Sequence, residues 1–192
     1  MKHGATSFFP TLSSSPFSEI RKAVDICEKL MAEPDSPILG LHVEGPYLNR
    51  KMAGEQFANQ VKEVDVAEYT SLLESTDCIK RWDASPELPG ALDFARYLKS
   101  KGIVGAVSHT EAEYDGIKEA YEAGFTHAAH FYNAMPGFHK RREYKYEGTV
   151  ESVYLTDGMT IELIADGIHL PSTILKLAYK LKGVEPVSYT HL

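Results

Sequence analysis

The sequence predicts an α/β fold in which parallel strands are joined by crossover helices. Short apolar runs of β-compatible residues alternate several times with longer stretches whose apolar residues recur at the helical period. Glycine and proline residues separate these runs, and no internal repeat or low-complexity segment interrupts the alternation. Such a pattern is typical of a parallel sheet, either in a (β/α) barrel or in a doubly wound arrangement.

The first half of the chain contains three pairs of a strand and a helix. We expect strands at residues 4–9, 38–43 and 78–84, and helices at residues 18–31, 64–73 and 88–98. Pro10 closes the first strand, Gly45-Pro46 stops the second, and Pro89 suits the first turn of the third helix. The connection from residue 47 to 61 is long, which is typical of a binding loop.

The second half continues the pattern and then loosens. We expect a strand at 103–107, a helix at 110–123 that opens with a capping box of Thr110 and Glu113, and a strand at 125–130. Residues 135–148 have the composition of a basic loop. Residues 150–165 are expected to form two short β or mixed segments around the turn signal Asp157-Gly158, before a last helix at 171–181.

Composition limits the class of protein. A chain of 192 residues, 43% hydrophobic and 24% charged, is long enough for one sizeable core, and we expect one domain. Its formal net charge of -7 argues against nucleic acid or an anionic membrane as the main partner. Cys27 and Cys78 are far apart and match no disulfide or metal-binding pattern, which suits a reducing cytoplasm. No export signal or membrane-spanning segment is visible.

Three possible metal ligands, Glu44, His109 and His130, fall at the carboxyl ends of expected strands. In parallel α/β folds this edge of the sheet is where catalytic groups gather. A carboxylate with two imidazoles is a familiar ligand set for zinc or a similar divalent ion. A single histidine near a strand end is more often a hydrogen-bonded core or loop residue. Three such residues, each at the carboxyl end of its strand, favour a metal site.

Four motifs follow one another along the chain: His42-Val43-Glu44-Gly45-Pro46, Ser108-His109-Thr110, His130-Phe131-Tyr132-Asn133-Ala134-Met135 and Ala165-Asp166-Gly167-Ile168-His169. In this order they resemble the successive motifs of the N-acetylglucosamine-6-phosphate deacetylases of the amidohydrolase superfamily. The resemblance reaches to about Pro186. It implies an internal fragment of a TIM-type (β/α)8 barrel, truncated at both ends, with residues 1–186 in the barrel and residues 187–192 as a tail that does not match.

The resemblance also implies roles for individual residues. Glu44, His109 and His130 would bind a divalent metal, with zinc expected, and a phosphosugar would be contacted by Gln56, Asn133, Ala134, Arg142 and His169. Gln56 stands where many members have a histidine. Arg141 is the other candidate for the role of Arg142, because the Pro-Gly that usually follows Arg-Glu is absent. The basic segment 139–145 favours a phosphorylated ligand.

The activity implied is metal-dependent cleavage of N-acetylglucosamine 6-phosphate to acetate and glucosamine 6-phosphate, a step of amino-sugar catabolism in the cytoplasm. Full-length relatives are expected to be homo-oligomers. The family's catalytic Asp, in a Thr-Asp-Ala motif, has no match in residues 187–192, and Asp157 lies before the last motif, so the catalytic residue stays unassigned. The fragment is therefore expected to be inactive. The alternatives are an amidohydrolase with a different acyl substrate and a non-catalytic metal or sugar-phosphate binding fragment.

Overall fold

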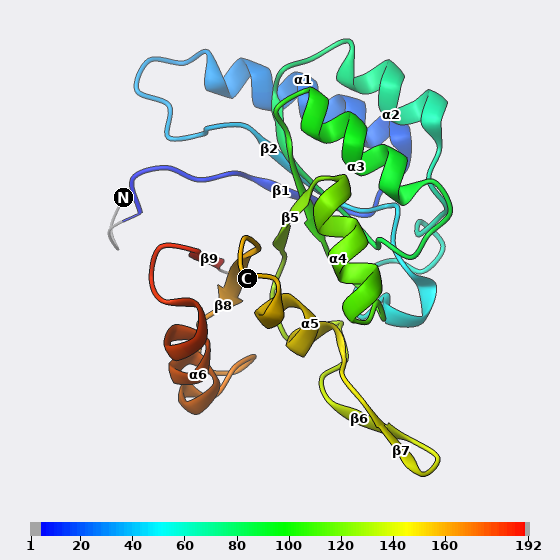
Figure 1. The fold of residues 1–192 in the computed structure, drawn as a ribbon. Coiled ribbons are helices and arrows are strands. Elements are labelled where there is room, and N and C mark those ends of the chain that lie inside the picture. Colours follow the sequence, from blue (N-terminus) through cyan, green and yellow to red (C-terminus); the bar gives the residue numbers. More distant parts are fainter. Residues whose placement is uncertain (1–4, 191–192) are drawn as a thin grey trace.

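The computed structural model describes residues 5–190 and contains a seven-stranded parallel sheet with helices on its outer face (Figure 1). The order across the sheet is β1-β2-β3-β4-β5-β8-β9, so the strands of this sheet follow one another as they do in the sequence. A doubly wound sheet would reverse its order at a switch point. The order is therefore that of a (β/α) barrel, and the expected partial barrel is confirmed.

The strands of this sheet are short and closely paired. They are β1 (Thr11–Ser13), β2 (Leu41–Glu44), β3 (Ile79–Ala84), β4 (Val104–Val107), β5 (Phe125–Ala128), β8 (Thr160–Ile164) and β9 (Val187–Thr190). Neighbouring strands pair in parallel, with Glu44 opposite Ser13 of β1 on one side and Asp83 of β3 on the other. The residues expected to form a non-matching tail thus include β9, which pairs with β8.

Six α-helices and one short 3-10 helix are found in residues 5–190. They are α1 (Phe17–Met31), η1 (Arg50–Met52), α2 (Val66–Leu73), α3 (Ala91–Ser100), α4 (Tyr114–Ala123), α5 (Thr149–Leu155) and α6 (Ser172–Lys182). No helix among these described residues is long and apolar enough to cross a membrane.

The main core lies between the sheet and the helices on its outer face. Trp82 of β3 is fully buried, and its ring packs edge-on against Phe94 of α3 at a centroid distance of 5.3 Å. Tyr47, just after β2, stacks on Trp82 at 5.9 Å. Alternate residues of the same strand, Arg81 and Asp83, point to the other face of the sheet. Successive side chains of the strand therefore alternate between an apolar outer face and a charged concave face of the sheet.

The first expected strand is displaced along the chain. Residues 4–9 were expected to form it, whereas β1 begins at Thr11, after Pro10; Gly4 lies outside the described residues. Phe8 makes a single parallel bridge with Ile38, and the carbonyl oxygen of Pro10 accepts a hydrogen bond from His42 N–H at 3.0 Å. Proline lacks only a donor, so it is tolerated at the edge of a sheet, and the extended segment continues through it.

The helix starts were also only partly predicted. α3 begins at Ala91 rather than at residue 88, because Gly90 has a φ of 82° and leads the chain into the helix. The capping box expected of Thr110 and Glu113 is wrong, because α4 begins at Tyr114 with no side-chain cap. The Thr110 hydroxyl instead donates to Glu87 Oε2 at 2.5 Å and accepts from Ala112 N–H at 2.9 Å.

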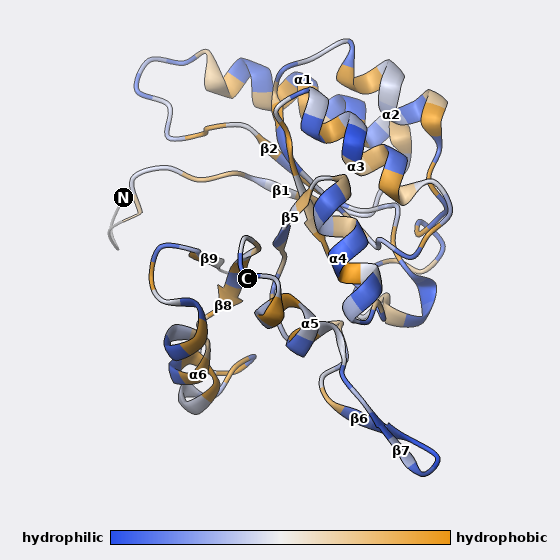
Figure 2. Ribbon diagram, viewed as in Figure 1, coloured by the Kyte–Doolittle hydropathy of each residue, from blue (hydrophilic) through white to orange (hydrophobic). Residues whose placement is uncertain are grey.

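Two segments after β5 differ from the expected structures. The basic loop contains an antiparallel hairpin of β6 (His139–Arg141) and β7 (Tyr144–Tyr146), which projects from the body and is mostly hydrophilic (Figures 1 and 2). The first of the two expected β or mixed segments is the helix α5, whereas the second is the strand β8. Val150 and Val153 are β-branched, which is typical of strands, yet they lie on one buried helical face.

Candidate metal centre

The structure brings Glu44, His109 and His130 together at the carboxyl edge of the sheet. Glu44 Oε1 lies 3.0 Å from His109 Nε2 and 3.3 Å from His130 Nε2. One ligand atom from each residue lies within 4.8 Å of the other two. Zinc ligands at tetrahedral positions and bond lengths of about 2.0–2.2 Å are roughly 3.3–3.6 Å apart. The three side chains are therefore spaced for one ion.

The backbone decides which ring nitrogens carry protons. His109 Nδ1 lies 2.7 Å from the carbonyl oxygen of Met52, and His130 Nδ1 lies 3.1 Å from that of Asn133. A carbonyl oxygen can only accept, so each Nδ1 is the donor, and each neutral ring leaves an Nε2 lone pair. These two lone pairs converge on the Glu44 carboxylate. Three acceptors at this distance need a cation or protons between them.

The pKa shifts of Glu44 and His130 agree with this geometry. Burial alone would raise the pKa of Glu44, but hydrogen bonds and positive charge from His109 and His130 lower it well below its usual range. Burial alone would lower the pKa of His130, and its interaction with Glu44 raises it. The site thus stabilises one negative charge surrounded by positive charge.

The loops that carry the ligands are held in unusual backbone conformations. His109 and His130 have positive φ values of 47° and 32°, and Ala134 has a φ of 52°. Residues other than glycine rarely adopt this region, and they do so at sites where the surroundings impose it. Gly45, directly after Glu44, has a φ of 90°, and a Cβ there would lie 2.3 Å from Ser14 Oγ. The chain therefore turns sharply as soon as it has placed Glu44.

Sequence reasoning missed two residues that hold the His109 loop. Ser85 donates its hydroxyl hydrogen to the carbonyl oxygen of His109 at 2.7 Å and accepts from Asn49 N–H at 2.7 Å. Glu87 accepts from Thr110 Oγ1 and from Glu111 N–H, at 2.5 and 2.9 Å. Both residues directly follow β3. Because catalytic groups gather at the carboxyl ends of parallel strands, this position was a signal by which they could have been found.

A cavity of about 470 Å3 opens beside the three candidate ligands. Gln56 lines it, yet its side chain is already engaged, because Nε2 donates to Glu44 Oε1 and Oε1 accepts from Ser14 N–H, both at 2.8 Å. Gln56 therefore orients the carboxylate of Glu44 as well as facing the cavity.

Three of the other expected substrate residues also line this cavity, namely Asn133, Ala134 and His169. His169 follows β8, and its Nδ1 lies 2.7 Å from Asp166 Oδ2. Asp166 Oδ1 accepts the backbone N–H of Ile168 and of His169, at 2.8 and 2.9 Å. The same hydrogen bonds lower the pKa of Asp166 to about 2. The turn that presents His169 is therefore fixed by its own hydrogen bonds.

Arg142 is not among the residues that line the cavity. It lies in the two-residue turn between β6 and β7, at the exposed tip of the hairpin, with a φ of 55°. Arg141, the other candidate, forms an ion pair with Glu113 and stacks 3.8 Å over the ring of Tyr146. The structure does not bring either arginine to the three candidate ligands within this chain.

The floor of the cavity carries charges that sequence reasoning also missed. Arg81 Nε lies 2.9 Å from Asp83 Oδ1, and Arg81 Nη2 lies 2.6 Å from Glu162 Oε2. Asp83 Oδ1 also lies 2.9 Å from His42 Nε2. Barrel interiors are usually filled by branched apolar side chains. The sequence signal was a charged residue inside a short strand, namely Arg81 and Asp83 in β3 and Glu162 in β8.

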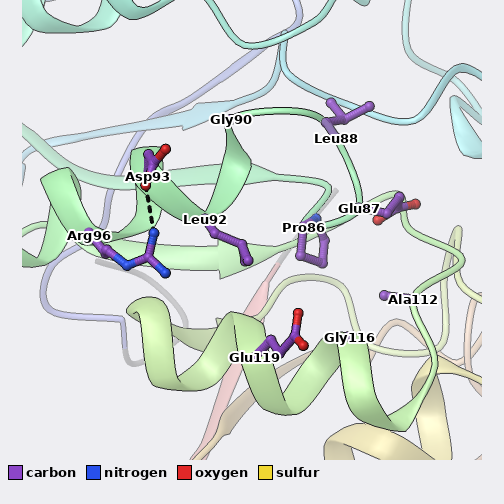
Figure 3. A pocket seen from close by; sticks show the side chains of 10 residues that line it. All are labelled: Pro86, Glu87, Leu88, Gly90, Leu92, Asp93, Arg96, Ala112, Gly116 and Glu119. Atoms are coloured by element: carbon purple, nitrogen blue, oxygen red, sulfur yellow. Dashed lines mark hydrogen bonds and ion pairs between the residues drawn. The ribbon is translucent and has the colours of Figure 1, made fainter.

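A second cavity, of about 510 Å3, lies on the outer face between α3, α4 and the loop after β3 (Figure 3). Its charged side chains include Glu87, Glu119 and the ion pair of Asp93 with Arg96 at 2.6 Å. None of the residues that line it is a histidine or a cysteine. Of these two cavities, the one with the Glu-His-His cluster therefore has the side chains that suit metal chemistry.

Fold and site together define a barrel-type α/β chain with a candidate divalent-metal centre at the carboxyl edge of its sheet. No protein-family model matches the sequence. The chain is 30% identical over 200 residues to N-acetylglucosamine-6-phosphate deacetylase of Lysinibacillus sphaericus, a match that covers 97% of this chain and 48% of that protein.

Solved structures agree. The deacetylase of Pasteurella multocida superposes with a TM-score of 0.90 and 28% identity, over 99% of this chain and 48% of the other. A mutant of the Mycobacterium smegmatis deacetylase in complex with N-acetyl-D-glucosamine-6-phosphate gives 0.87 and 28%, over 97% and 48%. The chain is thus homologous to the N-acetylglucosamine-6-phosphate deacetylases, as its motifs predicted, and it spans about half the length of the relatives it matches.

The buried charges of the cavity floor give a prediction about stability. Burial alone would raise the pKa of Asp83, but Arg81 and His42 lower it well below its ordinary value of 3.8. A carboxylate whose pKa is lowered in the folded state contributes its full stabilisation at pH values above its ordinary pKa. This contribution is lost as the pH falls below about 4. Asp83→Asn should therefore lower the free energy of unfolding by about 3 kcal/mol or more at pH 7, and by less below pH 4.

Urea denaturation across this pH range measures the effect. Asp93→Asn is the matched control, because Asp93 forms an exposed ion pair with Arg96 and such pairs contribute at most about 1 kcal/mol. Equal losses for the two variants at pH 7 would contradict the account of the cavity floor.

Proposed function

We propose that this chain forms the metal-binding and sugar-phosphate-binding part of a deacetylase site for N-acetylglucosamine 6-phosphate. The observation that carries the proposal is the convergence of two imidazole lone pairs on the carboxylate of Glu44 beside a cavity of about 470 Å3. The reaction is hydrolysis of the acetamide, which yields acetate and glucosamine 6-phosphate. The names of the relatives support this substrate.

Zinc is the proposed ion, held by Glu44, His109 and His130, because a mixed nitrogen and oxygen set with a free position suits it. When bound, the ion would lower the pKa of a water molecule and polarise the acetamide carbonyl. The chain's own residues prepare the site. The carbonyl oxygens of Met52 and Asn133 orient the two rings, and Gln56 orients the carboxylate.

The proposed phosphosugar contacts are Asn133, Ala134 and His169, which line the cavity, and Gln56 beside Glu44. Arg142 lies at the hairpin tip and does not line the cavity. Its proposed role as a phosphate ligand therefore rests only on the resemblance. The proposed location is the cytoplasm, because the spacing of Cys27 and Cys78 in the sequence matches no disulfide framework.

Two alternatives use the same metal centre. An amidohydrolase with another acyl substrate would keep the Glu-His-His set and change the contacts around His169. A non-catalytic binding chain is favoured by one observation: no aspartate lines the cavity among residues 5–190. Substrate binding and acetate release therefore have to be measured separately.

Metal binding is the first prediction of the proposal. Glu44→Gln and His130→Ala should each lower the zinc bound per chain severalfold, because each removes one of three ligands. His127→Ala is the control, since His127 lies two residues before the ligand-bearing loop and its Nδ1 is 2.6 Å from Thr160 Oγ1. Elemental analysis after dialysis decides the outcome. Equal zinc content in the unsubstituted chain and in all three variants would contradict the assignment of the metal ligands.

Substrate binding is tested through His169. His169→Ala should weaken binding of N-acetylglucosamine 6-phosphate about tenfold and leave the zinc content intact, because a lost hydrogen bond to a charged group is worth about 1.5–3 kcal/mol. Calorimetric titration with the phosphosugar and with unphosphorylated N-acetylglucosamine measures the contact. Loss of zinc in this variant would place His169 among the metal ligands, and an unchanged phosphosugar affinity would exclude the contact.

Turnover is expected to be slow in the 192-residue chain. Hydrolysis needs a group that takes a proton from water and gives it to the leaving amine, and such help typically contributes about 10²–10⁴-fold. The carboxylate of Asp166 is already hydrogen-bonded to His169, and Asp157 does not line the cavity. Acetate release at the rate of a full-length deacetylase would mean that one of them, or another residue, transfers the proton.

A further inference from the structure

The two halves of the cavity are attached to the sheet in different ways. The candidate metal ligands follow β2, β4 and β5, whereas His169 follows β8. β8 joins β5 through only two register pairs, His127 with Thr160 and Ala128 with Ile161. β2 and β3, in contrast, share four register pairs. Where His169 lies therefore depends on what else holds β8.

An ion pair across the concave face supplies a second attachment. Arg81 on β3 and Glu162 on β8 meet at 2.6 Å, with side chains 14% and 11% exposed. In the sheet order β3-β4-β5-β8 the two strands are three spacings apart, which is about 14 Å in a flat sheet. The ion pair spans the two strands between them. Ala106 of β4, the neighbour of Asp83, is small enough to leave room for it.

Arg81 is itself fixed from the side of β3. Its Nε lies 2.9 Å from Asp83 Oδ1, and its Nη2 lies 3.2 Å from Asp83 Oδ2, a two-point contact that sets the plane of the guanidinium. Asp83 is fully buried and is also held by His42 at 2.9 Å. The arginine is therefore a rigid anchor for Glu162.

The anchored strand leads directly to His169. The carbonyl oxygen of Glu162 accepts a hydrogen bond from Phe131 N–H at 2.7 Å, next to His130. Beyond Glu162, Ile164 lines the cavity, and Asp166 then fixes the turn that carries His169. A displacement of β8 would thus move His169 away from the three candidate ligands.

We propose that the Arg81–Glu162 ion pair positions His169 relative to the Glu44, His109 and His130 cluster, so that one phosphosugar can contact both. Arg81 and Glu162 are positioning residues in this inference, which rests on the proposed function only for the identity of the ligand. Both side chains act through β8 and need not touch the substrate.

The test measures position and affinity separately. Spin labels are attached to Lys51→Cys and Ile168→Cys, because both side chains are highly exposed and the native Cys27 and Cys78 are buried. Lys51 lies beside Met52, which contacts His109, and Ile168 lies beside His169. Glu162→Leu removes the ion pair and leaves Arg81 balanced by Asp83. Asp93→Leu removes the exposed Asp93–Arg96 pair and is the control.

We expect Glu162→Leu to at least double the width of the label-to-label distance distribution and to weaken N-acetylglucosamine 6-phosphate binding about tenfold, with zinc content unchanged. Asp93→Leu should change none of these. Glu162→Gln, which keeps the side-chain shape, should give a smaller effect and replaces the leucine variant if that one does not fold.

Each result bears on one claim. An unchanged distance distribution in a folded Glu162 variant overturns the positioning role, whatever the affinity. Absence of phosphosugar binding in the unsubstituted chain overturns the proposed ligand, while the distance measurement still decides whether the ion pair places His169. A loss of zinc in Glu162→Leu would also contradict the inference, because the ion pair would then support the metal ligands themselves.

Discussion

Glu44 Oε1 lies within 3.3 Å of two imidazole nitrogens, and much of the surrounding structure keeps these three acceptors together. Two backbone carbonyl oxygens fix the rings with their lone pairs toward the carboxylate, and Gln56 fixes the carboxylate itself. Acceptors so arranged repel one another unless positive charge lies between them. The positive φ values of His109 and His130 are a cost that the fold accepts for this arrangement.

The concave face of the sheet explains how so much charge can lie in one place. Arg81 is shared by Asp83 and Glu162, and His42 and His127 lie beside these carboxylates, so the charges compensate one another within the chain. A buried charge network of this kind is weak evidence for net stability, although removal of one partner leaves an uncompensated buried charge. Here the network links β3 and β8, which are not neighbours in the sheet.

The sequence predicted the parts of the fold that depend on local pattern. Short apolar, β-compatible runs placed Glu44, His109 and His130 at the carboxyl ends of expected strands, and the structure has them at or just after the ends of β2, β4 and β5. Parallel strands share one carboxyl edge, so the three residues were expected to lie close together. The hairpin of β6 and β7 was missed because its residues are mostly basic and do not alternate between apolar and polar side chains. Contacts between distant strands, such as Arg81 with Glu162, have no local signature, and the orienting role of Gln56 depends on how a long loop folds back.

The coordination of bound zinc shows whether the ion lies between Glu44, His109 and His130. X-ray absorption spectroscopy on the zinc-loaded chain reports the atoms around the ion and their distances. We expect two imidazole nitrogens and a carboxylate oxygen at about 2.0–2.2 Å, with the remaining position taken by water. Loss of imidazole scattering in His109→Ala would support the same assignment. A shell made only of oxygen atoms would contradict it, because the ion would then lie on surface carboxylates and not between Glu44, His109 and His130.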